Sequence, residues 1–497
     1  MGNTIFAYLF GYGLPFGVVI GMAVVSILAL GLFIAYPKYG ALPFFAAVLI
    51  FVNTAYGIRV EDIGGGFSVY SKGGRYLPFP IIQFYLYGLL LATWLGNQFS
   101  GYRPLKQSGG VWMLLFVVMF AGHITVGLFE GEHWQTLLSQ RGLMNVIHMI
   151  MVIYIVATVL KDDKDLAGLT KIFLGVAVYH ALYGLGRFFL FGGDPQNAYE
   201  NLGGLNIKIT YWDINEGLIA TVSAFYFAWR LTHEWKQLST GAKWLFLVCL
   251  AAEILVIVFS FRRTNWFGLL LAGAFFLYWQ PPNRRWIYFV LGVAVVLPSL
   301  LAVGTYRAEE TLNRTDLTFI ERIAPDSAKA KSLTDKESRF FELYAALQTV
   351  KEKPLFGVGT WGSFKVGASE HLALLFHQGR YDFVHSGFGH VLLKSGLVGL
   401  VLFTGILVAV WRFASRMRRW IPENRLAIFE SFRAGFVFFI PNLLTGTPVA
   451  EFRTMIWLGL VLAVPLAIAK MSAPREQASQ PQGAAKPTLA NGLSAQQ

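Results

Sequence analysis

The chain has 497 residues, of which 55% are hydrophobic and only 14% are charged, and its mean hydropathy is +0.52. A soluble domain carries about 25% charged residues. Apolar runs of about 17–25 residues, the length at which a helix crosses a bilayer, recur along this sequence instead. The composition therefore excludes an ordinary soluble protein and predicts an all-α, polytopic membrane helical bundle.

The formal net charge of +13 raises the question of an acidic partner. Most of the basic excess lies in short connections between apolar runs, which is typical of membrane proteins, so we expect no nucleic acid partner. The single cysteine, Cys249, excludes an intrachain disulfide. The first apolar run extends from about Leu14 to Tyr36, too long for the core of a cleavable signal peptide, and we expect none.

The apolar runs predict about 12–13 transmembrane helices. Their expected starts lie near Leu14, Leu42, Phe79, Val111, Leu143, Leu169, Ile214, Trp244, Trp266, Trp286, Gly387, Ala427 and Met455. The most basic connection, Trp411–Trp420, is expected in the cytoplasm because Lys and Arg favour that side. Alternation of the spans then places four more basic connections beside it, those of Arg103, Lys161, Lys236 and Arg284.

A long polar segment, 305–385, lies on the opposite side, which this orientation makes the periplasm. Within it, Lys336–Leu347 has the pattern of an amphipathic helix. Its expected apolar face is made of Phe340, Leu343, Tyr344 and Leu347. We therefore expect a helical periplasmic cap. Residues 1–470 would form one transmembrane bundle that includes this segment, and 471–497, rich in Ala, Gln, Ser and Pro, would be a disordered cytoplasmic tail.

Two adjacent arginines, Arg262 and Arg263, interrupt the apolar sequence at a tight outward-facing turn. A cation at the centre of a bilayer costs about 2.5–3.5 kcal/mol or more, so these side chains must reach the interface or a partner. One interpretation is that they extend to lipid headgroups. The other is an anion site, because the planar guanidinium binds phosphate oxygens through charge-assisted hydrogen bonds.

Further polar residues lie in or beside the expected spans. Arg187, seven residues after His180, would lie near the outer end of its span, where it would join an anion site or form a structural ion pair. Asp213 and Glu216 are expected at an outer interface, where they are candidates for sugar contacts. Glu253 falls in mid-span and needs a partner, for which Arg187 and His180 are candidates.

Three segments carry a more specific pattern. They are Ser260–Trp266, the Pro354–Gly359 segment with Arg339 before it, and His385–Gly399. In this order and spacing they resemble the O-antigen ligase and polymerase superfamily. The family pattern is a Ser-x-Arg turn, an Arg before Pro-Leu-x-Gly-x-Gly, and a helix start of the form His-Asn-x-x-Leu-x-x-Leu-x-x-x-Gly-x-x-Gly.

The chain departs from this pattern at two positions. Ser386 replaces the usual Asn, and Gly389 stands where Leu is common. The paired arginines also leave the register of the first motif open, although the Arg-Thr-x-Trp continuation favours Arg263 over Arg262.

The resemblance implies a membrane glycosyltransferase of the bacterial inner membrane with its active site facing the periplasm. Such an enzyme transfers a glycan from an undecaprenyl diphosphate carrier to a hydroxyl of lipid A-core or a similar acceptor in lipopolysaccharide biosynthesis. The reaction inverts the anomeric centre and requires neither a metal nor another cofactor. The expected partners are the lipid-linked donor, the glycan acceptor and membrane lipids.

The resemblance also implies roles for particular residues. Arg263 and Arg339 would bind the diphosphate, with Arg262 and Arg187 as further candidates, because preorganised cations stabilise a negatively charged leaving group. His385 would be the general base, since an acceptor hydroxyl is a poor nucleophile and an imidazole titrates near neutrality.

Alternatives remain open for the base and for the function. Glu61 and Asp62 are rivals to His385, because many polyprenyl-dependent glycosyltransferases use an acidic residue in an early outer loop. A polymerase of the same superfamily would use a second lipid-linked glycan as acceptor. A transporter or flippase of lipid-linked glycan is a third possibility. Against it, the sequence contains no internal repeat, and the candidate polar residues gather on one side.

Overall fold

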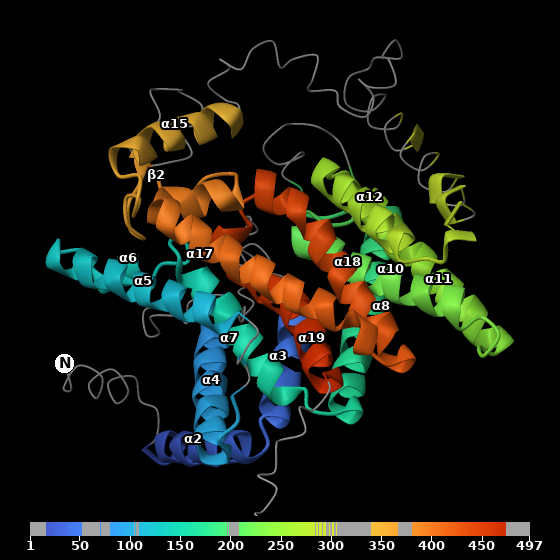
Figure 1. Ribbon diagram of the computed structural model, residues 1–497, viewed down its shortest axis with the longest axis horizontal. Helices are drawn as coiled ribbons and strands as arrows, with labels where there is room; N and C mark the ends of the chain where they lie inside the picture. The colour runs from blue at the N-terminus through green and yellow to red at the C-terminus, as the bar shows by residue number, and fades with distance from the viewer. Residues whose placement is uncertain are drawn as a thin grey trace, which may run out of the picture.

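The computed structural model describes residues 16–51, 70, 80–103, 105, 109–195, 197, 208–283, 285–286, 288–290, 292–294, 298, 301–302, 305, 339–365 and 380–473. Helices dominate this part of the chain (Figure 1). They are α2 (Phe16–Ala35), α3 (Lys38–Ile50), α4 (Ile81–Ser100), α5 (Gly110–Phe129), α6 (Trp134–Leu137), α7 (Met144–Val159), α8 (Asp163–Leu190), α10 (Ile214–His233), α11 (Thr240–Val258), α12 (Arg263–Tyr278), α15 (Arg339–Glu352), α17 (Gly387–Met417), η5 (Arg418–Trp420), α18 (Glu423–Thr445), η6 (Pro448–Ala450) and α19 (Phe452–Ser472). Two short strands, β1 (Phe364–Lys365) and β2 (Arg380–Tyr381), pair antiparallel.

Helix α19 is the centre of the bundle and is buried along its length. Helices α7, α10, α17 and α18 pack around it (Figure 1). Gly459 allows α7 to approach closely, since a β-carbon at this position would lie 3.0 Å from the carbonyl oxygen of Met149. Small residues permit such backbone contact between membrane helices. An apolar sequence on every side of α19 is what a central helix requires.

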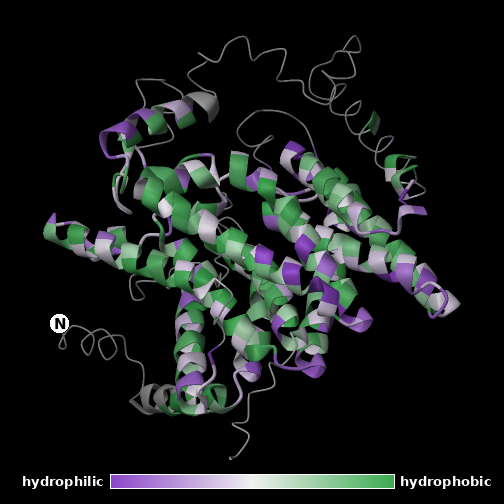
Figure 2. Cartoon of the chain, viewed as in Figure 1, coloured by the Kyte–Doolittle hydropathy of each residue, from purple (hydrophilic) through white to green (hydrophobic). Residues whose placement is uncertain are grey.

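Six helices of the described part are long and apolar enough to cross a membrane, namely α5, α8, α11, α17 with η5, α18 and α19. The adjoining Ile27–Ala35 and Lys38–Ile50 pass the same criteria together but meet at a bend of 106°. Figure 2 shows hydrophobic residues along the middle of the helices and hydrophilic residues gathered toward several of their ends. The prediction of a polytopic helical membrane bundle is confirmed.

The predicted number of spans is larger than these six or seven. Helices form at the other predicted positions too, but α7 and α12 have only 16 residues each. Helices α4 and α10 have 20 residues each, but polar residues such as Gln83 and Asn97 in α4 and Glu216 and Arg230 in α10 lower their hydropathy. Length and hydropathy therefore separate two groups of helices among the predicted spans. The span expected from Trp286 falls largely outside the described residues.

One end of the bundle, which we call the His385 end, carries the starts of α7, α10, α12, α17 and α19. The side-chain amide of Asn145 in α7 donates to the carbonyl of Val449 before α19 at 3.0 Å. A β-carbon on Gly217 of α10 would lie 2.8 Å from Nδ2 of Asn265 in α12. The helix ends at this side thus lie in close contact with one another.

The opposite end, which we call the Arg416 end, carries the basic connections. Lys38, the first residue of α3, pairs with Asp165 of α8 at 3.0 Å, and Arg425 of α18 pairs with Asp163 at 2.6 Å. The ammonium group of Lys161 lies 5.5 Å from the ring centre of Tyr102 after α4. The basic connections therefore share one end, as the Lys/Arg bias predicted.

The cap at the His385 end consists, in its described part, of α15, the β1–β2 pair and the loop between α15 and β1. The predicted helix exists, and its apolar face was predicted only in part: Leu343 packs against the rest of the cap, but Tyr344 and Leu347 do not belong to the buried face. Ala346 and Val350 are buried, whereas Tyr344 is 58% exposed and Leu347 39% exposed. The small Ala346 side chain lies on the buried face together with Leu343 and Val350. Residues 306–338, 366–379 and the tail from 474 lie outside the described residues.

Candidate active site

His385 immediately precedes α17 and is held by Glu342 in the first turn of α15. Its ring Nδ1 lies 2.7 Å from Oε2 of Glu342, and its backbone N–H donates to Oε1 at 2.9 Å. The imidazole is 35% exposed, so the ring is anchored but accessible. Because an ionised carboxylate only accepts hydrogen bonds, Nδ1 carries the proton in the neutral ring and Nε2 carries the lone pair.

The two departures from the family pattern have structural explanations. Ser386 is the N-cap of α17, where its Oγ accepts a hydrogen bond from the backbone N–H of Gly389 at 3.1 Å. Serine and asparagine are both favoured N-cap residues. A β-carbon on Gly389 would lie 2.7 Å from Cδ1 of Leu343. Gly389 thus leaves room for α15, which carries Glu342 to His385.

The Pro354–Gly359 segment docks on a break inside α17. Gly396 has φ +60° and ψ −161°, a conformation that favours glycine, and the helix is kinked there. The break frees backbone groups, and the segment satisfies them: Leu397 N–H donates to the carbonyl of Pro354 at 2.9 Å, and Val358 N–H to the carbonyl of Leu393 at 3.0 Å. Two of the motifs found in the sequence therefore form one structural unit with the start of α17.

The Phe383 ring lies beside His385, and a further cation lies over that ring. Arg141, in the connection between α6 and α7, pairs with Asp382 at 3.1 Å, and its guanidinium lies 5.9 Å from the ring centre of Phe383. The Phe383 ring in turn lies 5.4 Å from the His385 ring. Burial and the neighbouring Glu342 carboxylate raise the pKa of Tyr381 above its ordinary value, which keeps this phenol neutral.

The arginine pair occupies a constrained turn between α11 and α12. Phe261 is buried and has φ +54°, a left-handed conformation that is uncommon for a bulky residue. Ser260 Oγ accepts from the side chain of Asn265 at 3.2 Å and from the backbone of Arg262 at 3.4 Å. Backbone strain of this kind persists only where the surrounding packing enforces it.

The turn separates the two arginine side chains. Arg262 donates to the backbone carbonyl of Trp212 and lies over its ring at 5.0 Å, so it is held by the protein. Arg263 is the first residue of α12 and is exposed at the helix N-terminus. Anions are favoured at such a position by the helix dipole and the unpaired backbone N–H groups.

The starts of α12 and α17 lie at the same end of the bundle, on two sides of the last turns of α18 (Figure 1). A β-carbon on Gly268 would overlap the carbonyl oxygen of Phe438, and one on Gly387 would lie 3.1 Å from that of Leu443. Arg339 begins α15, one turn before Glu342. Arg263, the start of α15 and His385 thus lie at one end of the bundle. The last turns of α18 lie between Arg263 and His385.

Two candidate sugar contacts were wrong. Asp213 and Glu216 are buried and pair with Arg453 of α19, whose Nη1 lies 2.9 Å and 2.8 Å from their carboxylate oxygens. Arg453 also donates to the backbone carbonyls of Val48 and Leu49. An arginine just inside the last apolar run was the signal missed in the sequence, because a buried cation requires an anion.

Arg187 is likewise occupied within the protein. It pairs with Asp194 at 3.2 Å, donates to the carbonyl of Thr210 and lies 4.8 Å from the ring centre of Tyr211. The structure favours the ion-pair alternative over a diphosphate contact. His180 pairs with Glu216 at 2.8 Å. The expected partnership of Arg187 or His180 with Glu253 was therefore wrong. Glu61 and Asp62, the rival bases, lie outside the described residues.

Comparison with known families adds evidence of another kind. Residues 244–404 match the family model described as O-antigen ligase. The match supports membership of the O-antigen ligase and polymerase superfamily, which the motifs in the sequence also indicate. The matched segment contains Arg262, Arg263, Arg339, Glu342 and His385, whereas the Arg453 cluster lies outside it. None of the curated proteins compared matches the chain. The family is one of glycan-transferring membrane proteins, and the matched segment places an accessible histidine and cations at one end of a helical bundle.

Proposed function

We propose that the chain is a membrane glycan ligase that transfers an undecaprenyl-diphosphate-linked polysaccharide to a hydroxyl of lipid A-core or a similar acceptor. The observation that carries this proposal is the His385–Glu342 pair within the O-antigen ligase segment. We further propose that the bundle lies in the bacterial inner membrane with its His385 end toward the periplasm. The basic Arg416 end supports that orientation, since Lys and Arg favour the cytoplasmic side.

The reaction would use His385 as the general base. Its Nε2 takes the proton of the acceptor hydroxyl as the oxygen attacks the anomeric carbon. The bond from that carbon to the diphosphate oxygen breaks, and undecaprenyl diphosphate leaves with the electron pair. Attack opposite the leaving group inverts the anomeric centre. Glu342 is a positioning residue that stabilises the imidazolium through Nδ1.

The cations would act on the leaving group. Arg263 at the start of α12 and Arg339 at the start of α15 are the proposed diphosphate contacts, because negative charge develops there as the glycosidic bond breaks. Arg262 supports the turn through Trp212 rather than the substrate. The donor lipid would lie along the helices, with its headgroup at the His385 end.

The experiment uses the full chain in liposomes with a lipid-linked glycan, in the presence and absence of lipid A-core. Glycan attached to core supports the ligase. Longer lipid-linked chains would instead identify a polymerase of the same superfamily, and passage across the vesicle membrane without covalent change would identify a flippase. His385→Ala should remove the product. His133→Ala, which changes an exposed histidine at the same end, is the matched control.

A further inference from the structure

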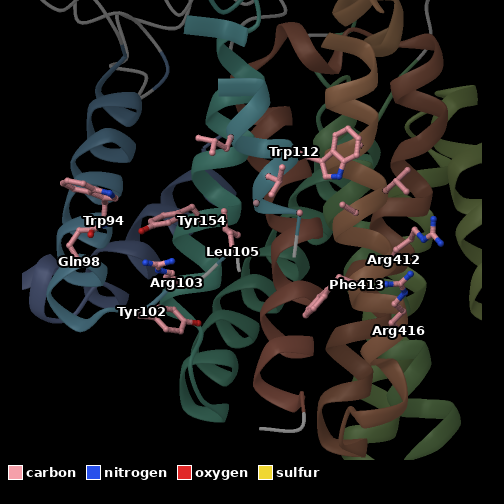
Figure 3. Close-up of a pocket in the computed structure, with 17 residues that line it drawn as sticks. Trp94, Gln98, Tyr102, Arg103, Leu105, Trp112, Tyr154, Arg412, Phe413 and Arg416 are labelled. Carbon is pink, nitrogen blue, oxygen red and sulfur yellow. The ribbon is translucent and has the colours of Figure 1, made fainter. Parts of the chain in front are cut away.

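A cavity of about 1030 Å³ opens at the Arg416 end, far along α17 from His385. Figure 3 shows its walls, which come from the ends of α4 and α7, the start of α5 and the second half of α17. The proposed reaction does not use this cavity, because α17 runs from the His385 end to the opposite face of the bundle before reaching it. Its volume is at the upper limit of pockets that hold small molecules, about 300–1,000 Å³.

Three arginines line the cavity and have no carboxylate partner among the described residues. They are Arg103 after α4, and Arg412 and Arg416 on α17 (Figure 3). None of the described lining residues is acidic. By contrast, Arg425 and Arg433 at the same end pair with Asp163 and Glu430, at 2.6 Å and 2.8 Å. The cavity therefore carries arginines without a carboxylate partner, whereas other arginines at this end are neutralised by ion pairs.

The remaining lining is apolar and aromatic. Trp94, Val111, Leu114 and Val408 expose much of their surface, so the cavity continues into a hydrophobic wall. Tryptophan and tyrosine are enriched at the level of lipid headgroups. An exposed apolar wall next to these cations is complementary to a molecule with an anionic head and a hydrocarbon tail.

Glycine residues shape the cavity. A β-carbon on Gly405 would overlap the indole of Trp112, so this ring lies directly against the backbone of α17. Gly109, with φ +94°, brings the start of α5 to within 3.2 Å of Ala409, measured from an added β-carbon to Cβ. The ammonium groups of Lys161 and Lys470 lie 5.5 Å and 5.9 Å from the ring centre of Tyr102, which adds positive charge beside the cavity.

We propose that this cavity binds an anionic glycerophospholipid of the leaflet at the Arg416 end. The anionic headgroup would lie in the part of the cavity bounded by Arg103 on one wall and by Arg412 and Arg416 on the other (Figure 3), because guanidinium groups bind phosphate oxygens through charge-assisted hydrogen bonds. An acyl chain would follow the wall of Val111, Leu114 and Val408. Basic pockets between membrane helices are suited to anionic headgroups. A single inorganic phosphate would occupy only a small part of this volume and leave the apolar wall exposed.

Native mass spectrometry of the full chain in neutral detergent tests this proposal. The probes are dioleoyl phosphatidylglycerol and dioleoyl phosphatidylcholine, which share their acyl chains. We expect one phosphatidylglycerol adduct with at least about 10-fold preference over phosphatidylcholine, given the contribution of several cations near one headgroup. The variant with Arg103→Gln, Arg412→Gln and Arg416→Gln should lose that preference. Equal binding of both lipids, or an unchanged triple variant, would overturn the proposal.

The matched control removes three exposed cations from the same end, with Lys164→Gln, Lys236→Gln and Arg419→Gln. It should keep the preference, and its loss would show that general surface charge binds the lipid. Val408→Trp retains the three arginines of the cavity and fills its apolar part, so it should also abolish the adduct. If Val408→Trp binds normally, or if inorganic phosphate or a polyprenyl diphosphate displaces phosphatidylglycerol at equal concentration, the assignment is wrong.

Discussion

Gly396 and Leu355 contact each other through their backbones, so closely that a β-carbon on Gly396 would overlap the carbonyl group of Leu355. The contact joins the break in α17 to the Pro354–Gly359 segment. Leu397 and Val398 donate their backbone N–H groups to the carbonyls of Pro354 and Leu355 at 2.9 Å and 3.1 Å. The cap is therefore fastened to the membrane bundle by main-chain contacts, which position the start of α17 relative to α15.

Gly396→Ala should destabilise the protein and impair transfer. A non-glycine residue in this conformation costs about 1–3 kcal/mol, and the overlap with Leu355 adds to that cost. The midpoint of thermal unfolding in detergent measures the effect. Gly175→Ala in α8 is the control, because a β-carbon there has no atom within 4 Å, and we expect no loss of stability. Equal midpoints for the two variants would show that the docked segment does not depend on the break.

Glu342→Gln should lower kcat while leaving KM for the donor unchanged. The glutamine oxygen can still accept from the backbone of His385, but the neutral side chain no longer stabilises an imidazolium and its amide can donate to Nδ1. We expect a loss on the order of 10²-fold, the lower end of what a positioned base contributes. Glu352→Gln, an exposed position at the end of the same helix, should have wild-type kinetics. A higher KM with an unchanged kcat would mean that Glu342 serves substrate binding instead.

The sequence was sufficient to predict the class of fold, because the length and hydropathy of the apolar runs and the Lys/Arg bias of their connections are direct consequences of crossing a bilayer. The order of the motifs also predicted that His385 and Arg263 lie on one side of the membrane, and the starts of α17 and α12 do lie at the same end of the bundle. Glu342 was not found, although it lies one turn after Arg339 in a predicted helix. Its role depends on how α15 docks on α17, and that docking is decided by Leu343 against Gly389, a contact between distant segments.

The same limitation explains the error at Asp213 and Glu216. Hydropathy placed them near an interface, where a carboxylate can face water or a sugar. Their actual position is decided by Arg453, more than 200 residues later, as the separations of 240 and 237 residues show. Local patterns cannot identify a long-range ion pair. A cation within an apolar run does indicate that an anionic partner is required somewhere in the bundle.

Arg263 and Arg262 should respond differently to substitution. Arg263→Ala should reduce kcat/KM for the lipid-linked donor, and Arg263→Lys should restore little, since a point charge lacks the guanidinium fork. Arg262→Ala should chiefly lower thermal stability, because Arg262 is bound to Trp212. Steady-state kinetics with varied donor, together with unfolding midpoints, separates the two. A larger kinetic loss at Arg262 than at Arg263 would show that Arg262 is the arginine of the motif that contacts the donor.

Arg453→Met should be strongly destabilising, since it leaves the buried Asp213 without its cation and Glu216 with His180 alone as a partner. Removing one partner from a buried ion pair costs about 3–5 kcal/mol. Adding Asp213→Asn and Glu216→Gln to Arg453→Met should recover much of the loss, because the remaining groups are then neutral. Thermal unfolding of the single and triple variants in detergent measures this recovery.

The same variants distinguish an internal cluster from a sugar site. An internal cluster predicts that Asp213→Asn alone lowers stability, because Arg453 then retains one carboxylate partner for its buried charge, and that KM for the donor is unchanged in the folded fraction. A sugar contact predicts the reverse, a raised KM at unchanged stability. Since both carboxylates are buried and lie within 2.9 Å of Arg453, we expect the first outcome. A raised KM for the donor without loss of stability would show that these carboxylates contact the substrate.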